Sequence, residues 1–153
     1  MYLRSVAIPE NSTIELAYAE PGVGGKNLVP DLSWGDAPEG TKSFALTCFD
    51  PDAPTGSGWW HWVAIDIPTD STGVAEGGDL PLGTKEWVND YGYVGWGGPW
   101  PPPGPAHRYI FTLHAVDLAE LGVPADATHA VVRFTLSFHI LASVSFTARF
   151  AVA

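Results

Sequence analysis

The sequence predicts a mainly β protein, built from antiparallel strands and carrying one late α-helix. Three observations favour this fold class. Segments rich in aromatic and β-branched residues recur until about residue 117, which is typical of strands in a sheet interior. Clusters of Gly, Pro and Asp separate these segments, as turns between strands require. Only one later stretch has apolar residues at helical spacing.

The strongest strand candidates are residues 43–49, 59–67 and 108–116. In the first of them, the apolar side chains Phe44, Leu46 and Cys48 alternate with smaller ones, which predicts a half-buried strand. Shorter candidates are residues 6–8, 14–17 and 145–152.

The helix is predicted to begin after Asp126 or Thr128, because either side chain can cap its first turn. Apolar residues then recur on one face, which we expect to be buried: Val131, Phe134, Phe138 and Leu141. His139 would lie within this helix, where it packs or caps rather than reacts.

Length and composition limit what the chain can be. Its 153 residues fit one domain spanning residues 1–153, with no internal repeat or shift in composition. With 46% apolar and 16% charged residues, the chain is not intrinsically disordered. Seven bases and 17 acids give a net charge of −10, so nucleic acid and anionic membrane surfaces are poor partners.

A single cysteine, Cys48, excludes an internal disulfide framework and a multi-thiolate metal site. Because it shares a strand face with Phe44 and Leu46, we expect its thiol to be buried and unreactive. The first residues form no apolar signal-peptide core, and residues 134–150 are too polar to span a bilayer as one helix. We therefore expect a cytoplasmic protein.

Residues 92–105 form the least ordinary segment, since ten of these fourteen residues are Gly or Pro. A flexible linker or a polyproline ligand is one interpretation. The segment lies in mid-domain and contains aromatic residues, however. Proline restricts φ and glycine permits close backbone approach, so a rigid loop that lines a pocket fits better.

Residues 50–54, Asp-Pro-Asp-Ala-Pro, follow the first strong strand. A residue before proline is held extended, so this corner is stiff enough to aim the carboxylate of Asp50. An ordinary proline turn with solvated acids explains the pentapeptide equally well.

The histidines differ in what their surroundings indicate. His61 lies in an apolar strand, where alternation places it with Trp59 and Val63, and such a residue is more often packed than a ligand. His107 and Tyr109 share one strand face, which suits a two-donor contact with an anion. His114 and His129 carry no functional signal.

Taken together, these segments resemble the phosphatidylethanolamine-binding protein (PEBP) family, in its bacterial Raf kinase inhibitor-like branch. The resemblance covers about residues 28–150. It rests on residues 30–34 (Pro-Asp-Leu-Ser-Trp), 43–46 (Ser-Phe-Ala-Leu), 50–54, 60–63 (Trp-His-Trp-Val) and 98–109 (Gly-Pro-Trp-Pro-Pro-Pro-Gly-Pro-Ala-His-Arg-Tyr).

The resemblance implies two antiparallel β-sheets with Greek-key connections and a small anion-binding pocket. The ligand-binding residues that it implies are Asp50, His61, Pro101, Pro102, His107 and Tyr109. It implies no cofactor, no metal and no catalytic residue, and it suggests a homodimer. Arg108 is expected to point away from His107 and to form a structural ion pair. Trp100 is expected to narrow the mouth of the pocket.

The resulting hypothesis is a regulatory or inhibitory module that binds phosphate, a phosphorylated head group or a similar anion. The kinase or protease that it would regulate is not indicated. One alternative is a hydrolase or zinc site made of Asp50, His61 and His107, since two histidines and a carboxylate can bind zinc. Another is a carbohydrate-binding β-sandwich, suggested by seven tryptophans.

Overall fold

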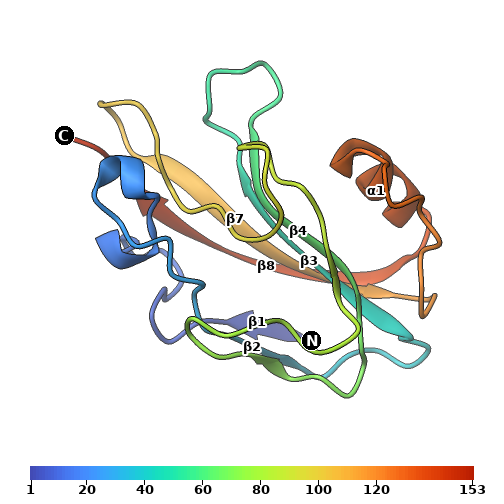
Figure 1. Cartoon of the computed structure of the whole chain (residues 1–153). Coiled ribbons are helices and arrows are strands. Elements are labelled where there is room, and N and C mark those ends of the chain that lie inside the picture. Colours follow the sequence, from blue (N-terminus) through green and yellow to red (C-terminus); the bar gives the residue numbers. More distant parts are fainter.

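Two antiparallel β-sheets form the framework of the computed structural model, which describes all 153 residues (Figure 1). The larger sheet has the order β6 (Lys85–Glu86), β4 (Trp59–Ile67), β3 (Ser43–Asp50), β7 (His107–Val116) and β8 (Ile140–Phe150). The smaller has the order β1 (Tyr2–Arg4), β2 (Leu32–Gly35) and β5 (Gly73–Val74). The helices are α1 (His129–Leu136) and the short 3₁₀ helices η1 (Leu16–Tyr18) and η2 (Pro21–Val23). The predicted fold class is confirmed.

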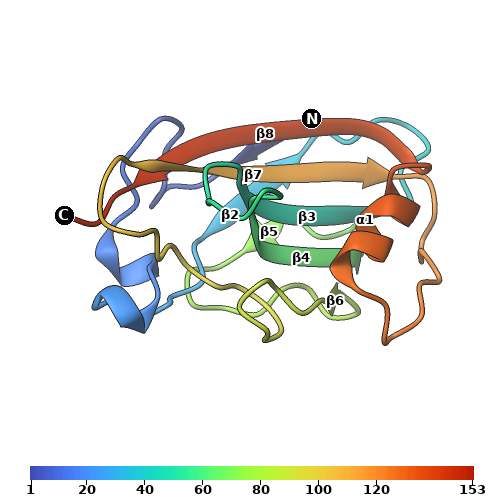
Figure 2. The same ribbon diagram turned by 90° about the horizontal axis from the view of Figure 1, so that it is seen from above.

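The larger sheet contains the expected Greek-key connection. Strands β3, β4 and β6 follow one another within this sheet, with β5 of the smaller sheet between β4 and β6 along the chain. Strand β7 then returns to pair with β3 on its other side (Figure 2). This return brings the end of β3 and the start of β7 to one edge of the molecule, beside the start of β4. The functional side chains discussed below lie at that edge.

The main core lies between the two sheets. It includes Trp34 from the small sheet and Leu46, Trp62 and Phe111 from the large one, all almost fully buried. The half-buried pattern predicted for β3 is wrong, because seven of its eight residues are buried. Its Ala45 contacts a second cluster on the opposite face, so β3 is covered on both sides.

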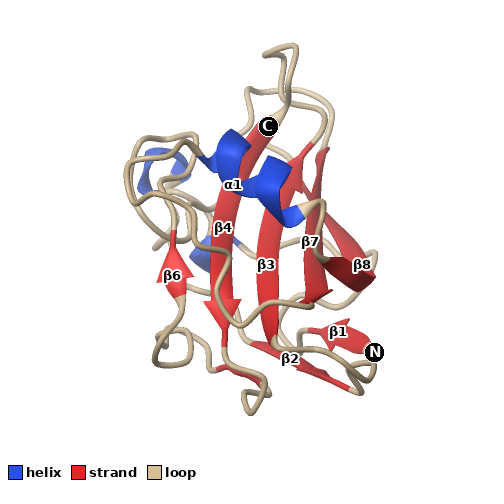
Figure 3. Ribbon diagram, turned by 90° about the vertical axis from the view of Figure 1, so that its right-hand side faces the viewer, coloured by secondary structure: helices blue, strands red, loops and turns tan.

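Helix α1 covers that opposite face, and it crosses the large sheet in Figure 3. Thr128 is its N-cap and accepts a hydrogen bond from the Val131 amide, as one of the two predicted caps requires. The predicted buried face is wrong. Val132 and Leu136 are buried, whereas Phe134 is 67% exposed and Phe138, 69% exposed, lies beyond the end of the helix.

His139 also lies outside α1, and its Nδ1 atom is 2.9 Å from Oδ1 of Asp117. The last strand begins at the next residue, Ile140, which is five residues earlier than the sequence predicts.

Arg133 of α1 packs against the large sheet, because its guanidinium lies 3.9 Å from the ring centroid of Trp60.

Two short predicted strands do not form. Residues 6–8 have no strand partner because the Asp31 carboxylate accepts from the amides of Val6 and Ala7, at 2.8 and 2.9 Å. Residues 14–17 contribute the buried Ile14 and then enter η1.

Cys48 is fully buried in β3, and burial raises the pKa of its thiol, as the sequence predicts for an unreactive cysteine. Among the helices, none has both the length and the apolar character needed to cross a membrane.

Candidate functional site

A cavity of about 360 Å³ opens at the edge where β3 ends and β4 and β7 begin. All six residues that the sequence singled out line it: Asp50, His61, Pro101, Pro102, His107 and Tyr109. Its volume falls in the range of small-molecule sites and exceeds the space that one phosphate ion fills. Trp100, 53% exposed, lies in the same lining, as expected of a residue at the mouth.

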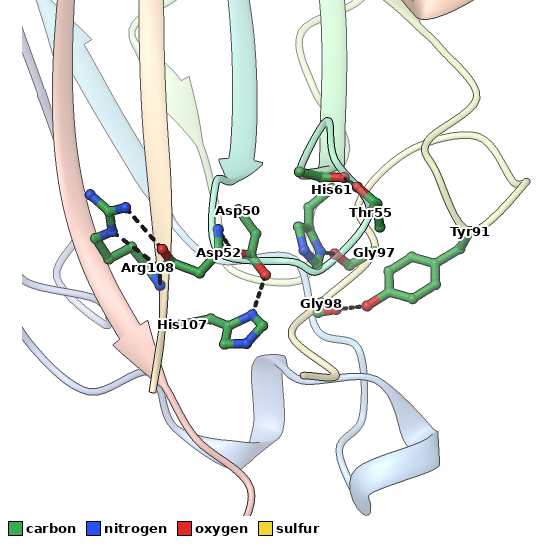
Figure 4. Close-up of polar contacts among 10 residues, drawn as sticks. Asp50, Asp52, Thr55, His61, Tyr91, Gly97, Gly98, His107 and Arg108 are labelled. Atoms are coloured by element: carbon green, nitrogen blue, oxygen red, sulfur yellow. Dashed lines mark hydrogen bonds and ion pairs between the residues drawn. The ribbon is translucent and has the colours of Figure 1, made fainter. Parts of the chain in front are cut away.

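Asp50 and His107 form a buried pair in this lining. The Nδ1–H of His107 donates to Oδ2 of Asp50 at 2.7 Å, and Oδ1 of Asp50 accepts from the Asp52 amide at 2.8 Å (Figure 4). The corner at residues 50–54 thus aims the Asp50 carboxylate into the site, as one of its two interpretations predicts. Because Nδ1 is used in this way, the Nε2 atom of His107 is left for a ligand.

Arg108 points to the other side of β7 and binds Asp52, as expected. The backbone N–H, Nε and one terminal nitrogen of Arg108 all donate to the Asp52 carboxylate, at 2.8, 3.1 and 2.9 Å. These hydrogen bonds lower the pKa of Asp52 to about 2. The contact ties the loop after β3 to the start of β7 and so fixes the distance between Asp50 and His107.

A β-bulge in β4 changes the direction of His61. Cys48 pairs with Trp62 and Phe49 with Trp60, so His61 has no partner on β3. Simple alternation would separate the side chains of His61 and Trp62. Both instead contact the ring of Trp96, at centroid distances of 6.4 and 5.5 Å. The predicted grouping of His61 with Val63 is therefore wrong, and the bulge turns the imidazole into the cavity.

The glycine- and proline-rich loop forms the opposite wall, as its pocket-lining interpretation predicts. Gly97 accepts from Nδ1 of His61 at 2.6 Å and donates its own amide to the His61 carbonyl at 2.9 Å. A Cβ atom at Gly98 would lie 2.0 Å from the Tyr18 carbonyl oxygen, so only glycine permits this approach. The flexible-linker interpretation is wrong, since residues 95–99 are buried.

Comparison with known proteins shows which family has this sequence. The sequence profile described as "Phosphatidylethanolamine-binding protein" matches residues 4–151. The chain belongs to the phosphatidylethanolamine-binding protein family. Among curated relatives, the UPF0098 protein YbhB of Escherichia coli is 48% identical over 134 residues, which cover 84% of this chain and 85% of YbhB. Escherichia coli YbcL is 40% identical over 145 residues, covering 90% of this chain and 79% of YbcL.

Solved PEBP structures share the fold. The crystal structure of Escherichia coli YbcL, described as a new member of the mammalian PEBP family, has a TM-score of 0.92 and 36% identity. The match covers 99% of this chain and 98% of that one. A putative PEBP homologue from Chlamydia trachomatis has a TM-score of 0.86 and 26% identity, with 99% and 97% covered.

The cavity has further lining residues that sequence reasoning did not assign to it: Ala53, Pro54, Thr55, Trp59 and Tyr91. Residues 53–55 continue the Asp50 corner, so that motif carried a signal for them. The sequence grouped Trp59 with His61 on one strand face, and both side chains line the cavity. Tyr91 donates to the Gly98 carbonyl at 2.8 Å, a contact for which the sequence offers no signal.

Three buried polar atoms in this lining have no hydrogen-bond partner in the protein: Nε1 of Trp59, Nε2 of His61 and the hydroxyl of Tyr109. Leaving such atoms unpaired costs free energy, which a bound polar group recovers. Burial raises the pKa of Tyr109, so its hydroxyl stays protonated and can donate.

His61 is neutral near pH 7, because burial lowers its pKa to about 4. In the unfolded chain the histidine pKa is near 6.5, so between pH 6.5 and 4 the unfolded state binds a proton that the folded state does not. The free energy of unfolding therefore falls as the pH falls through this window.

We expect this histidine to lower the free energy of unfolding by roughly 2 kcal/mol between pH 7 and pH 5. Urea denaturation at both pH values measures the loss, and His61→Gln, which cannot titrate, should reduce it by about that amount. An unchanged pH dependence in the variant would contradict the assignment.

The zinc alternative gains no support from the pocket, because no group of three or more His, Cys, Asp and Glu side chains converges to hold a metal ion. For carbohydrate, two tryptophans of β4 offer no flat exposed ring: Trp62 is buried, and Trp60 packs against Phe49, at a centroid distance of 4.3 Å, and Arg133. Trp100 in the pocket lining is 53% exposed, so the carbohydrate alternative stays a hypothesis.

Proposed function

We propose that this PEBP-family protein binds a small phosphorylated or similar oxyanionic group in the Asp50–His107 pocket and acts as a binding module, not as an enzyme. The observation that carries the proposal is the set of unpartnered polar atoms of Trp59, His61 and Tyr109 in one cavity. The Nε2 atom of His107, oriented by Asp50, adds a fourth polar contact. The family description, with its phosphorylated lipid head group, supports the same chemistry.

Electrostatics favour recognition at short range. The chain has a net charge of −10, which repels anions at a distance. Hydrogen bonds from Trp59 and Tyr109 must therefore supply the affinity, and low local polarity strengthens them. His107 adds a third donor when its ring carries a proton on both nitrogens, one facing the Asp50 carboxylate and the other the ligand. The rings of Trp59, Tyr91 and Trp100 leave room for an apolar substituent on the ligand.

Calorimetric titration with inorganic phosphate and with phosphoethanolamine tests the proposal. Saturable heat and a ligand-dependent rise in melting temperature are expected. Absence of both at millimolar ligand would overturn it.

Two further measurements separate the proposal from its alternatives. Titration in the presence of a chelator tests the zinc or hydrolase alternative, and a glycan array tests carbohydrate binding. Regulation of a kinase or protease and a cytoplasmic location stay predictions, and one relative from Mycobacterium tuberculosis is named a putative lipoprotein.

We also infer that the protein is a homodimer formed through the edge of β8. The backbone N–H of Arg149 donates to the Ser12 carbonyl, and its carbonyl accepts from the Ile14 amide. The backbone N–H and C=O groups of the odd-numbered residues of β8 therefore point away from β7. Toward the start of the strand, no chain segment outside the sheet bonds to Leu141, Ser143 or Ser145.

This open edge suits a second copy of the same chain. Residues 140–146 carry no charge, which removes the usual protection of an edge strand. Leu141 within this segment is exposed, and the exposed Phe134 and Phe138 precede it in the chain. Antiparallel pairing about a twofold axis at Ser143 satisfies the free groups of both copies and sets each Ser143 against the other.

The twofold axis makes a charge-reversal test possible. Ser143→Lys and Ser143→Asp, each alone, should weaken the dimer by roughly 100-fold or more, because like charges meet at the axis. Mixing the two variants should restore it. Sedimentation equilibrium measures the result against the chain mass of 16.3 kDa. A wild-type monomer at micromolar concentration, or a mixture that stays monomeric, would contradict this interface.

A further inference from the structure

His61 offers the cavity a hydrogen-bond acceptor, not a donor. Its Nδ1 atom lies 2.6 Å from the carbonyl oxygen of Gly97, and a carbonyl only accepts, so Nδ1 carries the proton. The Nε2 atom of the neutral ring then holds a lone pair. This atom has no partner in the protein, and the side chain, 1% exposed, lines the cavity.

We propose that His61 makes the pocket selective for oxyanions that carry a proton, namely hydrogen phosphate and singly protonated phosphate monoesters, over sulfate and phosphate diesters. The inference rests on the proposed function, since it concerns the ligand of the same cavity. A protonated phosphate presents an O–H group that can donate to Nε2. Sulfate and phosphate diesters present only lone pairs near neutral pH, so they leave this buried acceptor unsatisfied and face it with a repulsive contact.

The alternative protonation states of His61 are unfavourable. Moving the proton to Nε2 would place the lone pair of Nδ1 against the Gly97 oxygen at 2.6 Å. Protonating both nitrogens requires a buried cation, and burial lowers the pKa of this ring to about 4. The nearest carboxylate in the lining, that of Asp50, is already bonded to His107 and the Asp52 amide.

The remaining polar atoms complete the recognition of one phosphate group. Nε1 of Trp59 only donates, whereas the hydroxyl of Tyr109 can donate or accept. The Tyr109 ring lies against His61, with centroids 5.1 Å apart and planes at 71°. If Tyr109 donated to Nε2 instead of to the ligand, the selectivity would disappear, so the experiment also tests this arrangement.

Calorimetric titration at pH 5.5 and constant ionic strength compares phosphate with sulfate, and methyl phosphate with dimethyl phosphate. At this pH a phosphate monoester keeps one proton, because its second pKa is about 6. The protonated member of each pair is expected to bind roughly 10- to 100-fold more tightly. Equal affinities within a pair would overturn the inference and leave the proposed function standing. If none of the four ligands bound, the proposed function itself would fail.

Two variants show whether His61 is the residue responsible. In His61→Gln, the side-chain amide can turn either its oxygen or its NH₂ group to the ligand. Phosphate and sulfate should then bind within about threefold of each other. Trp59→Phe, a matched control, removes a donor and should weaken both anions equally. Retained selectivity in a folded His61→Gln protein, judged by its melting transition, would refute the assignment to His61.

Discussion

Replacing His107 with alanine is expected to lower the affinity for inorganic phosphate by roughly 10- to 150-fold. The variant loses the Nε2 contact to the anion, a hydrogen bond to a charged group worth roughly 1.5–3 kcal/mol. It also leaves the Asp50 carboxylate, 4% exposed, without its imidazole partner inside the pocket. Calorimetric titration at pH 7 measures the change directly.

His139→Ala is the matched control for this variant. His139 binds Asp117 beyond the far end of β7, so its loss should change phosphate affinity less than twofold. His129 is a poorer control, because it binds Asp90, which in turn accepts from the Trp60 amide beside the pocket. Wild-type affinity in His107→Ala would show that the anion does not contact this residue.

Leu136→Ala should lower the free energy of unfolding by roughly 2–5 kcal/mol. Leu136 is 2% exposed and packs with Val132 between α1 and the outer face of the large sheet. Removing its methyl groups therefore leaves a cavity in the second core cluster. Urea denaturation measures this loss. The phosphate affinity, measured in parallel, should not change, because Leu136 does not line the cavity.

Phe134→Ala is the control on the exposed face of the same helix. Its ring contacts Phe138, at a centroid distance of 5.2 Å, and otherwise faces solvent, so the expected loss is below about 1 kcal/mol. Both substitutions are made in the Ser143→Lys background, which is expected to be monomeric. A larger loss for Phe134→Ala than for Leu136→Ala would mean that the face predicted from the sequence is the buried one.

The sequence identified strands β3, β4 and β7 well because their signals are local. Aromatic and β-branched residues fill β4 and β7, and the predicted bounds differ from the structure by one residue at most. The six candidate pocket residues also lie around one cavity, because they belong to motifs at three adjoining strand ends. Their role as ligands awaits the titrations.

The errors arise where tertiary contacts decide. Helix α1 has apolar residues on more than one face, so spacing alone could not distinguish Phe134 from Leu136. The bulge at His61 leaves no mark in an apolar strand, and period-two alternation therefore gave the wrong side. Residues 6–8 resemble a strand, but the distant Asp31 carboxylate satisfies their amides.

The bulge in β4 has a consequence for how such a protein can diversify. On the N-terminal side of the bulge, Trp59 and His61 point into the cavity, whereas Val63 and Ile65, on its other side, pack in the second core cluster. Residues on the pocket side can therefore be substituted without changing how the rest of β4 pairs with β3. The same scaffold can exchange one ligand for another over evolutionary time, and an engineer could use the same boundary to graft a different specificity onto an unaltered core.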